Sequence, residues 1–304
     1  MAHLSIQLLG PFSVHLDDQP VSGFVSDKVR ALLAYLVTQS DRAYRRETLA
    51  GLLWPDVPET SARNSLRTAL VNLRSVIGDR VADPPFLYIS RTTLQFNVDS
   101  DYWLDVRAFD AHVAHQQWEH AVALYRGPLL EGFSLSDSPA FEQWALVLRE
   151  RLQRQVGEVL DRLGTASEAR GDYTRTQAIA CRQLELEPWH EGAHRALMRA
   201  LALGGERTLA LAQYQACVRA LREELDVEPE PETIALAEQI RAGTLQERPG
   251  WRSAASGPLP ASLPQPQPAA SSPVPKAATL GGEAPSLAER RLATVVHVEI
   301  DEAQ

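Results

Sequence analysis

The sequence predicts an α+β winged helix followed by an all-α, tetratricopeptide-like domain and then a disordered, proline-rich linker. Apolar residues near the N-terminus alternate as in strands and then change to helical spacing. Further along, a helical pattern repeats a glycine turn at the tetratricopeptide period, and a late segment is rich in Pro, Ala and Ser. We therefore expect a winged-helix domain at residues 1–99, a helical domain at 100–246, the linker at 247–288 and a short segment at 289–304.

The first residues predict two strands. Leu4, Ile6 and Leu8 alternate with polar residues, and the same alternation returns over residues 12–16. Asp17-Asp18-Gln19-Pro20 then supplies a turn. A small sheet is thus expected ahead of the first helix.

Three helices are expected next. The first follows a Ser26 cap, the second spans residues 46–53 and stops before Pro55, and the third spans about 61–78. In each, apolar residues recur at a spacing that places them on one face.

A hairpin closes the first domain. Its strands are expected at Phe86–Ser90 and Leu94–Asn97, joined by Arg91-Thr92-Thr93. Strands, three helices and a hairpin, in that order, are typical of a winged helix with an added N-terminal sheet.

The helical domain is predicted from a nearly continuous helical pattern over Leu104–Ala242. Gly171 opens one helix pair and Gly205 opens another, at the tetratricopeptide spacing. The two repeats differ, because Pro229 lies further from its glycine than Pro188 does from Gly171. We expect stacked helix pairs that share one core.

The composition changes abruptly after the helical domain. Nine of the 20 prolines fall within residues 249–285, where too few apolar side chains remain to offset the entropy of ordering. Residues 290–300 resemble a single strand. The chain is therefore expected to be a fragment or a truncated form of a longer protein.

Composition points to a globular protein in the cytoplasm. Hydrophobic residues make up 44% and charged residues 23% of the chain. No run reaches the roughly 20 apolar residues of a membrane helix, and no signal peptide precedes the first strand. The two cysteines, Cys181 and Cys217, have neither metal spacing nor a disulfide framework, which favours a reducing compartment.

The net charge of −9 is unevenly distributed. Residues 1–99 carry 10 basic and 10 acidic residues, whereas residues 100–248 carry 16 and 24. The acidity therefore belongs mainly to the helical domain. A neutral first domain can bind a nucleic acid if its cations gather on one face.

The third helix carries the sharpest functional signal. At about 100° per residue its apolar residues form one arc, and the other side lacks acidic residues over Ser61–Ile77. Arg, Asn and small methyl-bearing side chains are the groups that read guanine, adenine and thymine edges. The candidate base-reading residues are Arg63, Asn64, Arg67, Thr68, Val71, Asn72, Arg74 and Ser75.

Phosphate contacts are expected from two further groups. Arg45 and Arg46 begin the second helix, where backbone N–H groups also favour anions. Arg91, Thr92 and Thr93 form the tip of the predicted wing. The alternative for each of these residues is an ordinary solvated surface position.

Several motifs together resemble the bacterial regulators of the Streptomyces antibiotic regulatory protein family. The resemblance covers roughly residues 4–245. In the first domain it rests on Leu8-Leu9-Gly10-Pro11-Phe12, residues 28–36, Leu53-Trp54-Pro55-Asp56 and residues 61–67. In the helical domain it rests on residues 125–133, Trp144, Gly171-Asp172-Tyr173, residues 194–198 and Glu223-Glu224-Leu225.

The resemblance implies an OmpR-type winged helix that binds double-stranded promoter DNA. It also implies a bacterial transcriptional activator domain that mediates dimerisation and contacts RNA polymerase. The family's recognition helix falls on Ser61–Ile77. No cofactor or membrane partner is implied.

Enzymatic readings are weaker. His190-Glu191-Gly192-Ala193-His194 matches the zincin pattern H-E-x-x-H, but the helix that it begins needs its apolar positions for packing. No third ligand or nucleotide-binding loop accompanies it, so we expect neither a metal site nor catalysis. Two alternatives to a transcription regulator stay open: a tetratricopeptide-like interaction scaffold, and the N-terminal regulatory part of a larger signalling protein.

Overall fold

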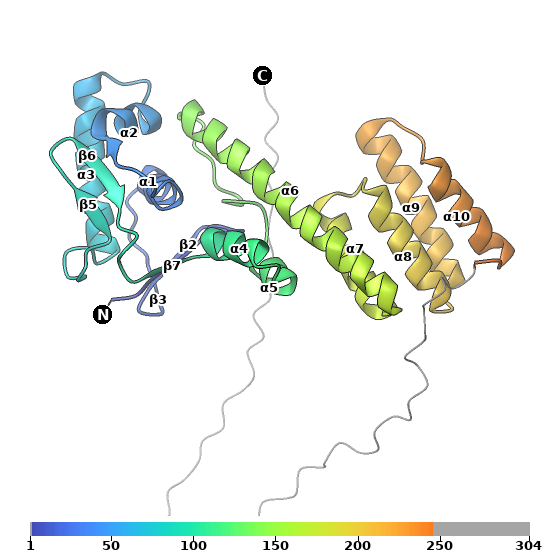
Figure 1. Ribbon diagram of the computed structural model, residues 1–304. Coiled ribbons are helices and arrows are strands. Elements are labelled where there is room, and N and C mark those ends of the chain that lie inside the picture. Colours follow the sequence, from blue (N-terminus) through green and yellow to red (C-terminus); the bar gives the residue numbers. More distant parts are fainter. Residues whose placement is uncertain (1, 246–304) are drawn as a thin grey trace, which may run out of the picture. The chain divides into compact units, whose positions relative to one another are not determined.

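The computed structural model describes residues 2–245, and the predicted linker and C-terminal segment lie outside these residues. The described part begins with strands and three helices, continues through a hairpin and a further strand, and is helical from there on (Figure 1). The strands are β1 (Leu4–Gln7), β2 (Ser13–Leu16), β3 (Gln19–Pro20), β4 (Tyr44–Arg45), β5 (Leu87–Ile89), β6 (Thr93–Phe96) and β7 (Tyr102–Leu104).

The helices of the first half are those predicted. They are α1 (Asp27–Thr38), α2 (Arg46–Leu53) and α3 (Glu59–Val76). The later helices are α4 (Asp105–Ala114), α5 (Trp118–Leu124), α6 (Pro139–Arg170), α7 (Tyr173–Leu186), α8 (Glu191–Leu203), α9 (Arg207–Leu225) and α10 (Pro231–Ala242).

The structure corrects three local predictions. Helix α3 begins at Glu59, two residues early, because Pro58 occupies its N-cap with a φ of −52°. Ser26 is the N-cap residue of α1, but its side chain makes no capping hydrogen bond. The helical pattern expected from Leu104 begins one residue later, because Tyr102–Leu104 is strand β7.

The strands form two sheets. In the first, of order β3-β2-β1-β7, β1 pairs antiparallel with β2 and parallel with β7. In the second, of order β4-β6-β5, the predicted hairpin gains the two-residue strand β4. Strands this short carry no readable periodicity, so β3 and β4 were not predicted from the sequence.

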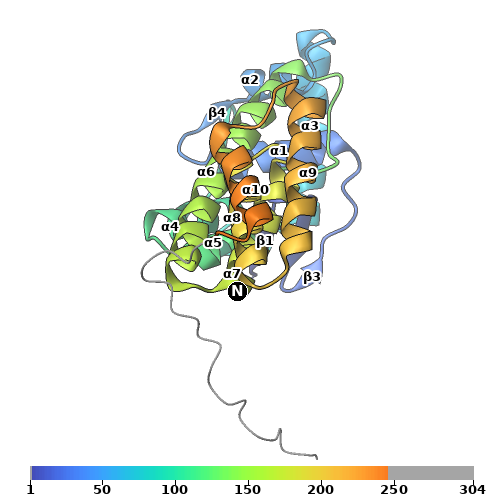
Figure 2. The ribbon, with the colours of Figure 1, turned by 90° about the vertical axis from the view of Figure 1, so that its right-hand side faces the viewer.

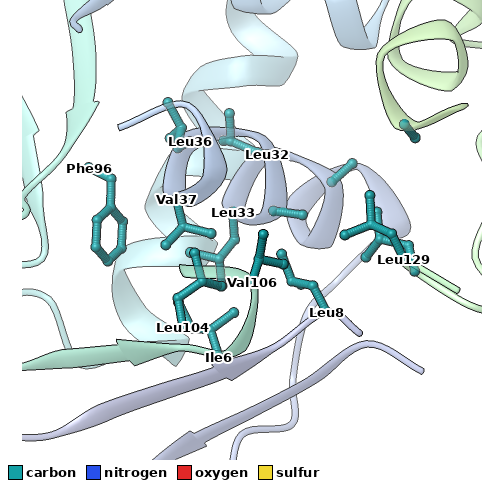
Figure 3. Packing of buried hydrophobic residues seen from close by; sticks show 14 of the residues in the cluster. Ile6, Leu8, Leu32, Leu33, Leu36, Val37, Phe96, Leu104, Val106 and Leu129 are labelled. Carbon is teal, nitrogen blue, oxygen red and sulfur yellow. The ribbon is translucent and has the colours of Figure 1, made fainter. Parts of the chain in front are cut away.

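The main hydrophobic core lies around α1. Its apolar side chains meet residues of β1, β6, β7, α4 and the α5–α6 loop (Figure 3). The figure labels Ile6, Leu8, Leu32, Leu33, Leu36, Val37, Phe96, Leu104, Val106 and Leu129. The same cluster includes Phe141 and Leu152 of α6. One core therefore runs through both halves of the described chain.

Asp105 fastens β1 to α4. Its buried carboxylate accepts the backbone N–H groups of Leu8 and Leu9, each at 2.8 Å, and lies 3.4 Å from the Arg126 guanidinium. Burial raises the pKa of the Asp105 carboxyl, while these N–H donors and Arg126 act in the opposite direction.

A second junction joins the first helices to α6. Lys28 Nζ of α1 lies 2.7 Å from Asp137 Oδ2, and this contact lowers the pKa of the Asp137 carboxyl. Next to it, Ser138 Oγ donates to the Leu53 carbonyl at the end of α2 over 2.9 Å. The N-terminal end of α6 is thereby held against α1 and α2.

Helices α7 to α10 lie side by side beyond α6 (Figures 1 and 2). Short turns join them, and the first uses Gly171 in a left-handed conformation with a φ of 72°. Asp172 then caps α7 by accepting from Arg175 N at 3.0 Å. A second apolar cluster lies among α7, α8, α9 and α10. These stacked helices confirm the tetratricopeptide-like fold that the glycine spacing predicts.

Candidate nucleic-acid interface

Helix α3 presents one buried and one open face. Its buried side chains pack into the main core: Ala62, Leu66, Ala69, Leu70 and Leu73. From Ser61 on, its exposed residues are Ser61, Arg63, Asn64, Arg67, Thr68, Val71 and Ser75, and Glu59 and Thr60 are exposed in the turn before them. The hydrophobic arc predicted from the spacing is the face that packs.

Asn64 and Arg67 have no partners for their side chains among residues 2–245, so their donors and acceptors point to solvent. Thr68 is exposed, and its Oγ1 donates to the Asn64 carbonyl at 3.2 Å. Val71, half exposed at 51%, adds an apolar contact on the same side. Together they offer a bidentate cation, an amide and methyl groups.

Arg63 differs from its neighbours because two carboxylates engage it. Its Nη2 atom lies 3.0 Å from Glu47 of α2 and 2.5 Å from Glu59 of α3. Glu47 and Glu59 both lie outside Ser61–Ile77, the segment of α3 whose outward side has no acidic residue. All three side chains are largely exposed, so the pairs are weak and a phosphate could compete for the arginine.

Asn72 and Arg74 have structural partners. Asn72 Nδ2 donates to the Gly23 carbonyl at 3.0 Å, and its Oδ1 accepts from Val25 N at 3.1 Å. The Arg74 guanidinium lies 2.7 Å from the buried Asp79 carboxylate. Asn72 therefore holds the loop before α1 against α3, and Arg74 holds the segment that follows α3.

Arg45 and Arg46 lie beside the wing. Arg45 of β4 is paired with Thr93 of β6, and Arg46 N donates to the Thr92 carbonyl at 2.9 Å. The structure thus brings together two groups that are more than 40 positions apart in the sequence. The Arg45 and Arg91 side chains are exposed, and Arg46 is half-buried, with no hydrogen-bond partner for its Nε among residues 2–245.

The tip of the wing is organised by Ser90, which the sequence analysis did not single out. Its hydroxyl accepts from Thr92 N at 3.1 Å and Thr93 N at 2.8 Å, and also contacts Thr93 Oγ1. A serine followed by threonines in a short hairpin is a signal for such a turn. These bonds leave Arg91 at the apex.

Asp79 connects α3 to the wing. Its carboxylate is buried, with one oxygen bound to Arg74 and the other accepting Leu87 N of β5 at 2.9 Å. The sequence offers little to identify Asp79, because a lone aspartate after a helix usually remains in solvent. Its position couples the orientation of the helix to that of the hairpin.

The H-E-x-x-H residues at the start of α8 each make hydrogen bonds within the protein. His190 caps the helix through Ala193 N at 3.0 Å, and His194 bonds the Pro188 carbonyl at 2.8 Å and Gln213 at 2.6 Å. Glu191 accepts Glu230 N at 2.9 Å. Within residues 2–245, no group of three or more His, Cys, Asp or Glu side chains is placed to hold a metal ion.

Comparison with known proteins supports a regulatory role. Residues 104–241 match the family described as "Bacterial transcriptional activator domain". The chain is 29% identical over 276 residues to the transcriptional regulatory protein EmbR of Mycobacterium tuberculosis, covering 84% of this chain and 68% of that protein. It is 29% identical over 252 residues to the regulatory protein AfsR of Streptomyces griseus, spanning 78% of this chain but 24% of AfsR.

A solved structure has the same arrangement. It is Mycobacterium tuberculosis EmbR in complex with a low affinity phosphopeptide, with a TM-score of 0.59 and 25% identity. The match covers 81% of this chain and 67% of that one. In the described residues, no helix is long and apolar enough to span a bilayer.

Proposed function

We propose that the chain binds double-stranded promoter DNA in a sequence-specific manner. The premise is that it belongs to the Streptomyces antibiotic regulatory protein family, which is a family of transcriptional regulators. In this proposal residues 1–99 bind DNA. Residues 100–246 act as the activator part, through dimerisation and contact with RNA polymerase, in the cytoplasm where promoter DNA lies.

One observation carries the proposal: the open face of α3, on which Asn64 and Arg67 have no protein partner within residues 2–245. A helix of this size fits the major groove, where arginine pairs with guanine and asparagine with adenine. In the proposed complex Arg67 and Asn64 contact base edges, and Thr68 and Val71 contact thymine methyl groups. Arg45, Arg46 and the wing hold phosphates on either side.

The N-terminal end of α2 and the tip of the wing carry the arginines that we propose to bind DNA phosphates. Arg46 is the first residue of α2, where the helix dipole favours an anion, although its own backbone N–H already donates to the Thr92 carbonyl. Arg45 adds an exposed cation next to it, and Arg91 adds another at the hairpin apex. Cations on two adjacent elements can follow one DNA backbone.

Selection of DNA sequences from a random pool by the purified protein tests the proposal. The wild type should enrich one motif, and Arg67→Ala should lose about 1–3 kcal/mol of binding to it, with the preference relaxed at one position. Asn64→Ala should relax a different position. Arg219→Ala is the matched control, because Arg219 is an exposed arginine of α9 far along the chain.

Two results would contradict the proposal. One is the absence of an enriched motif. The other is equal binding by the wild type and both α3 variants. A uniform loss of affinity for all sequences on Arg67→Ala would instead move Arg67 from base reading to phosphate contact.

A further inference from the structure

A cavity of about 550 Å³ lies between the two halves of the described chain. Its walls come from the C-terminal end of α1, from β6 and the residues after it, from α4 and from α6. A neighbouring hollow of about 410 Å³ continues along α6 and shares Gln39, Leu148 and Arg151 with it. The volume is within the range of small-molecule sites.

The floor of the cavity is apolar. Val37, Leu104 and Val106 lie near one another at its base and are each at most 5% exposed (Figure 3), whereas Leu148 of α6 is only partly buried. Val98, which is 41% exposed, stands at the rim. An apolar body of a few carbon atoms can displace water from Leu148 and Val98, which keep accessible surface.

Four charged side chains line the same cavity, and two of them neutralise each other. Arg151 binds Asp110 through two nitrogens, at 3.3 and 3.2 Å, and Gln155 donates to the same carboxylate. Asp110 is therefore already satisfied.

The other two charges are unpaired. Among residues 2–245, neither Arg107 nor Asp41 forms an ion pair. Arg107 is exposed, donates one hydrogen bond to Tyr102 and has its guanidinium carbon 5.9 Å from the centroid of the Tyr102 ring. Asp41 is exposed and follows α1 by three residues. The cavity thus holds one unmatched cation and one unmatched anion beside an apolar floor.

We propose that this cavity binds a small zwitterion with an apolar body, such as a free hydrophobic amino acid or a short apolar peptide. Its carboxylate pairs with Arg107, its ammonium group pairs with Asp41, and its apolar part covers Leu148 and Val98. Charge-assisted hydrogen bonds of this kind supply the selectivity, and the apolar contact supplies the affinity.

The location gives such a ligand a role in regulation. It would contact α1, which packs directly against α3, and also α4 and α6 of the helical half. A bound ligand can therefore shift the orientation of α3 relative to the helical half. This regulatory step rests on the proposed DNA binding, whereas binding of the zwitterion does not.

The test is calorimetric titration of the full chain without DNA. The probes are phenylalanine, tryptophan, Leu-Leu and Phe-Leu, which differ in the spacing of their two charges, each taken to its solubility limit. Saturable binding of one molecule per chain by at least one probe is expected. Phenylalaninamide and N-acetylphenylalanine, which each lack one charge, should bind more weakly than phenylalanine if that is the probe bound.

Three variants locate the site. Arg107→Gln and Asp41→Asn should each raise the dissociation constant by about tenfold or more, because each removes a charge-assisted hydrogen bond. Val98→Trp, at an exposed rim position, should block the cavity without disturbing the core. Arg219→Gln on α9 should bind as the wild type does.

Failure of all four probes to bind saturably overturns the proposal, as does binding that Arg107→Gln, Asp41→Asn and Val98→Trp leave unchanged. Binding of the two single-charge compounds as tightly as the zwitterion overturns the assigned ligand class. Because none of these titrations contains DNA, their outcome is independent of the DNA selection described above.

Discussion

On helix α3, side chains of the same chemical type have different partners. Arg67 and Asn64 face solvent, whereas Arg74 binds the buried Asp79 and Asn72 binds the loop of Gly23 and Val25. All four residues follow the helical spacing of α3, but neighbouring segments meet the side chains of Asn72 and Arg74 and leave those of Asn64 and Arg67 without a partner among residues 2–245. Base reading by Asn72 and Arg74 stays a prediction, and the geometry gives Asn64 and Arg67 the freer donors.

The histidines of α8 also show how a motif depends on its surroundings. His194 is buried, and burial lowers the pKa of its imidazole, while the bond to the Pro188 carbonyl acts in the opposite direction. Its neutral ring joins α8 to Gln213 of α9. The imidazole therefore acts as a buried packing group that also makes hydrogen bonds.

This lowered pKa predicts a pH dependence of stability. The unfolded imidazole, with its ordinary pKa of 6.5, binds a proton more readily than the folded one. The stability that His194 contributes is therefore present above about pH 6.5 and is lost as the pH falls toward the folded-state pKa. Urea unfolding from about pH 7.5 to pH 5 should show the advantage of the wild type over His194→Gln shrinking with acidity.

His115→Gln serves as the control, because His115 is exposed and its ring bonds only the Ala111 carbonyl of α4, which it follows directly. It should follow the wild type across the same pH range. An advantage over His194→Gln that is constant with pH would show that the His194 ring does not titrate differently in the folded protein.

At the scale of elements, the wing and the start of α2 form one cationic unit. The pairing of β4 with β6 places Arg45 opposite Thr93, and the turn around Ser90 places Arg91 at the apex. The two-residue strand β4 joins the start of α2 to the hairpin, because it pairs with β6 and leads directly into α2. The sequence placed the arginines near their elements, but pairing across the chain decides that they are neighbours.

Removing these cations should weaken binding to every DNA sequence about equally. Phosphate contacts carry no base information, and each cation removed from a phosphate should reduce the slope of log K against log salt by about 1. Fluorescence anisotropy over a salt series should show this for Arg45→Ala and for Arg91→Ala, with an additive effect in the double variant. A change of base preference without a change of slope would argue against phosphate contact.

At the scale of the whole described chain, the two halves share one continuous hydrophobic core. Strand β7 completes the sheet that β1 begins, and Asp105 binds the backbone of Leu8 and Leu9. Leu129 and Phe141 lie in the same buried cluster as α1. The placement of a domain boundary after residue 99 therefore stays a proposal about function.

A fragment of residues 1–99 should be markedly less stable than the full chain. It lacks β7, Asp105 and the buried side chains of Leu129 and Phe141, each apolar one being worth about 1.5–3 kcal/mol. The sum approaches the roughly 5–15 kcal/mol by which a domain is stable. Thermal unfolding followed by circular dichroism should show a broad transition at lower temperature for the fragment. A sharp transition at the temperature of the full chain would show that the first half folds independently.

The sequence by itself determined the order of the main helices and the hairpin, and which face of α3 is buried. These follow from the spacing of apolar residues, a property of the chain that each element carries alone. It also determined the tetratricopeptide-like stack, because the glycine turns recur at a fixed period.

The tertiary structure decided what each polar side chain does. It closed the first sheet with β7, turned Arg74 and Asn72 toward neighbouring segments, and left Arg67 and Asn64 open. It also brought Arg107 and Asp41 to one cavity from distant segments. Spacing along the chain fixes the direction of a side chain on its own helix, but not which other segment lies there to meet it.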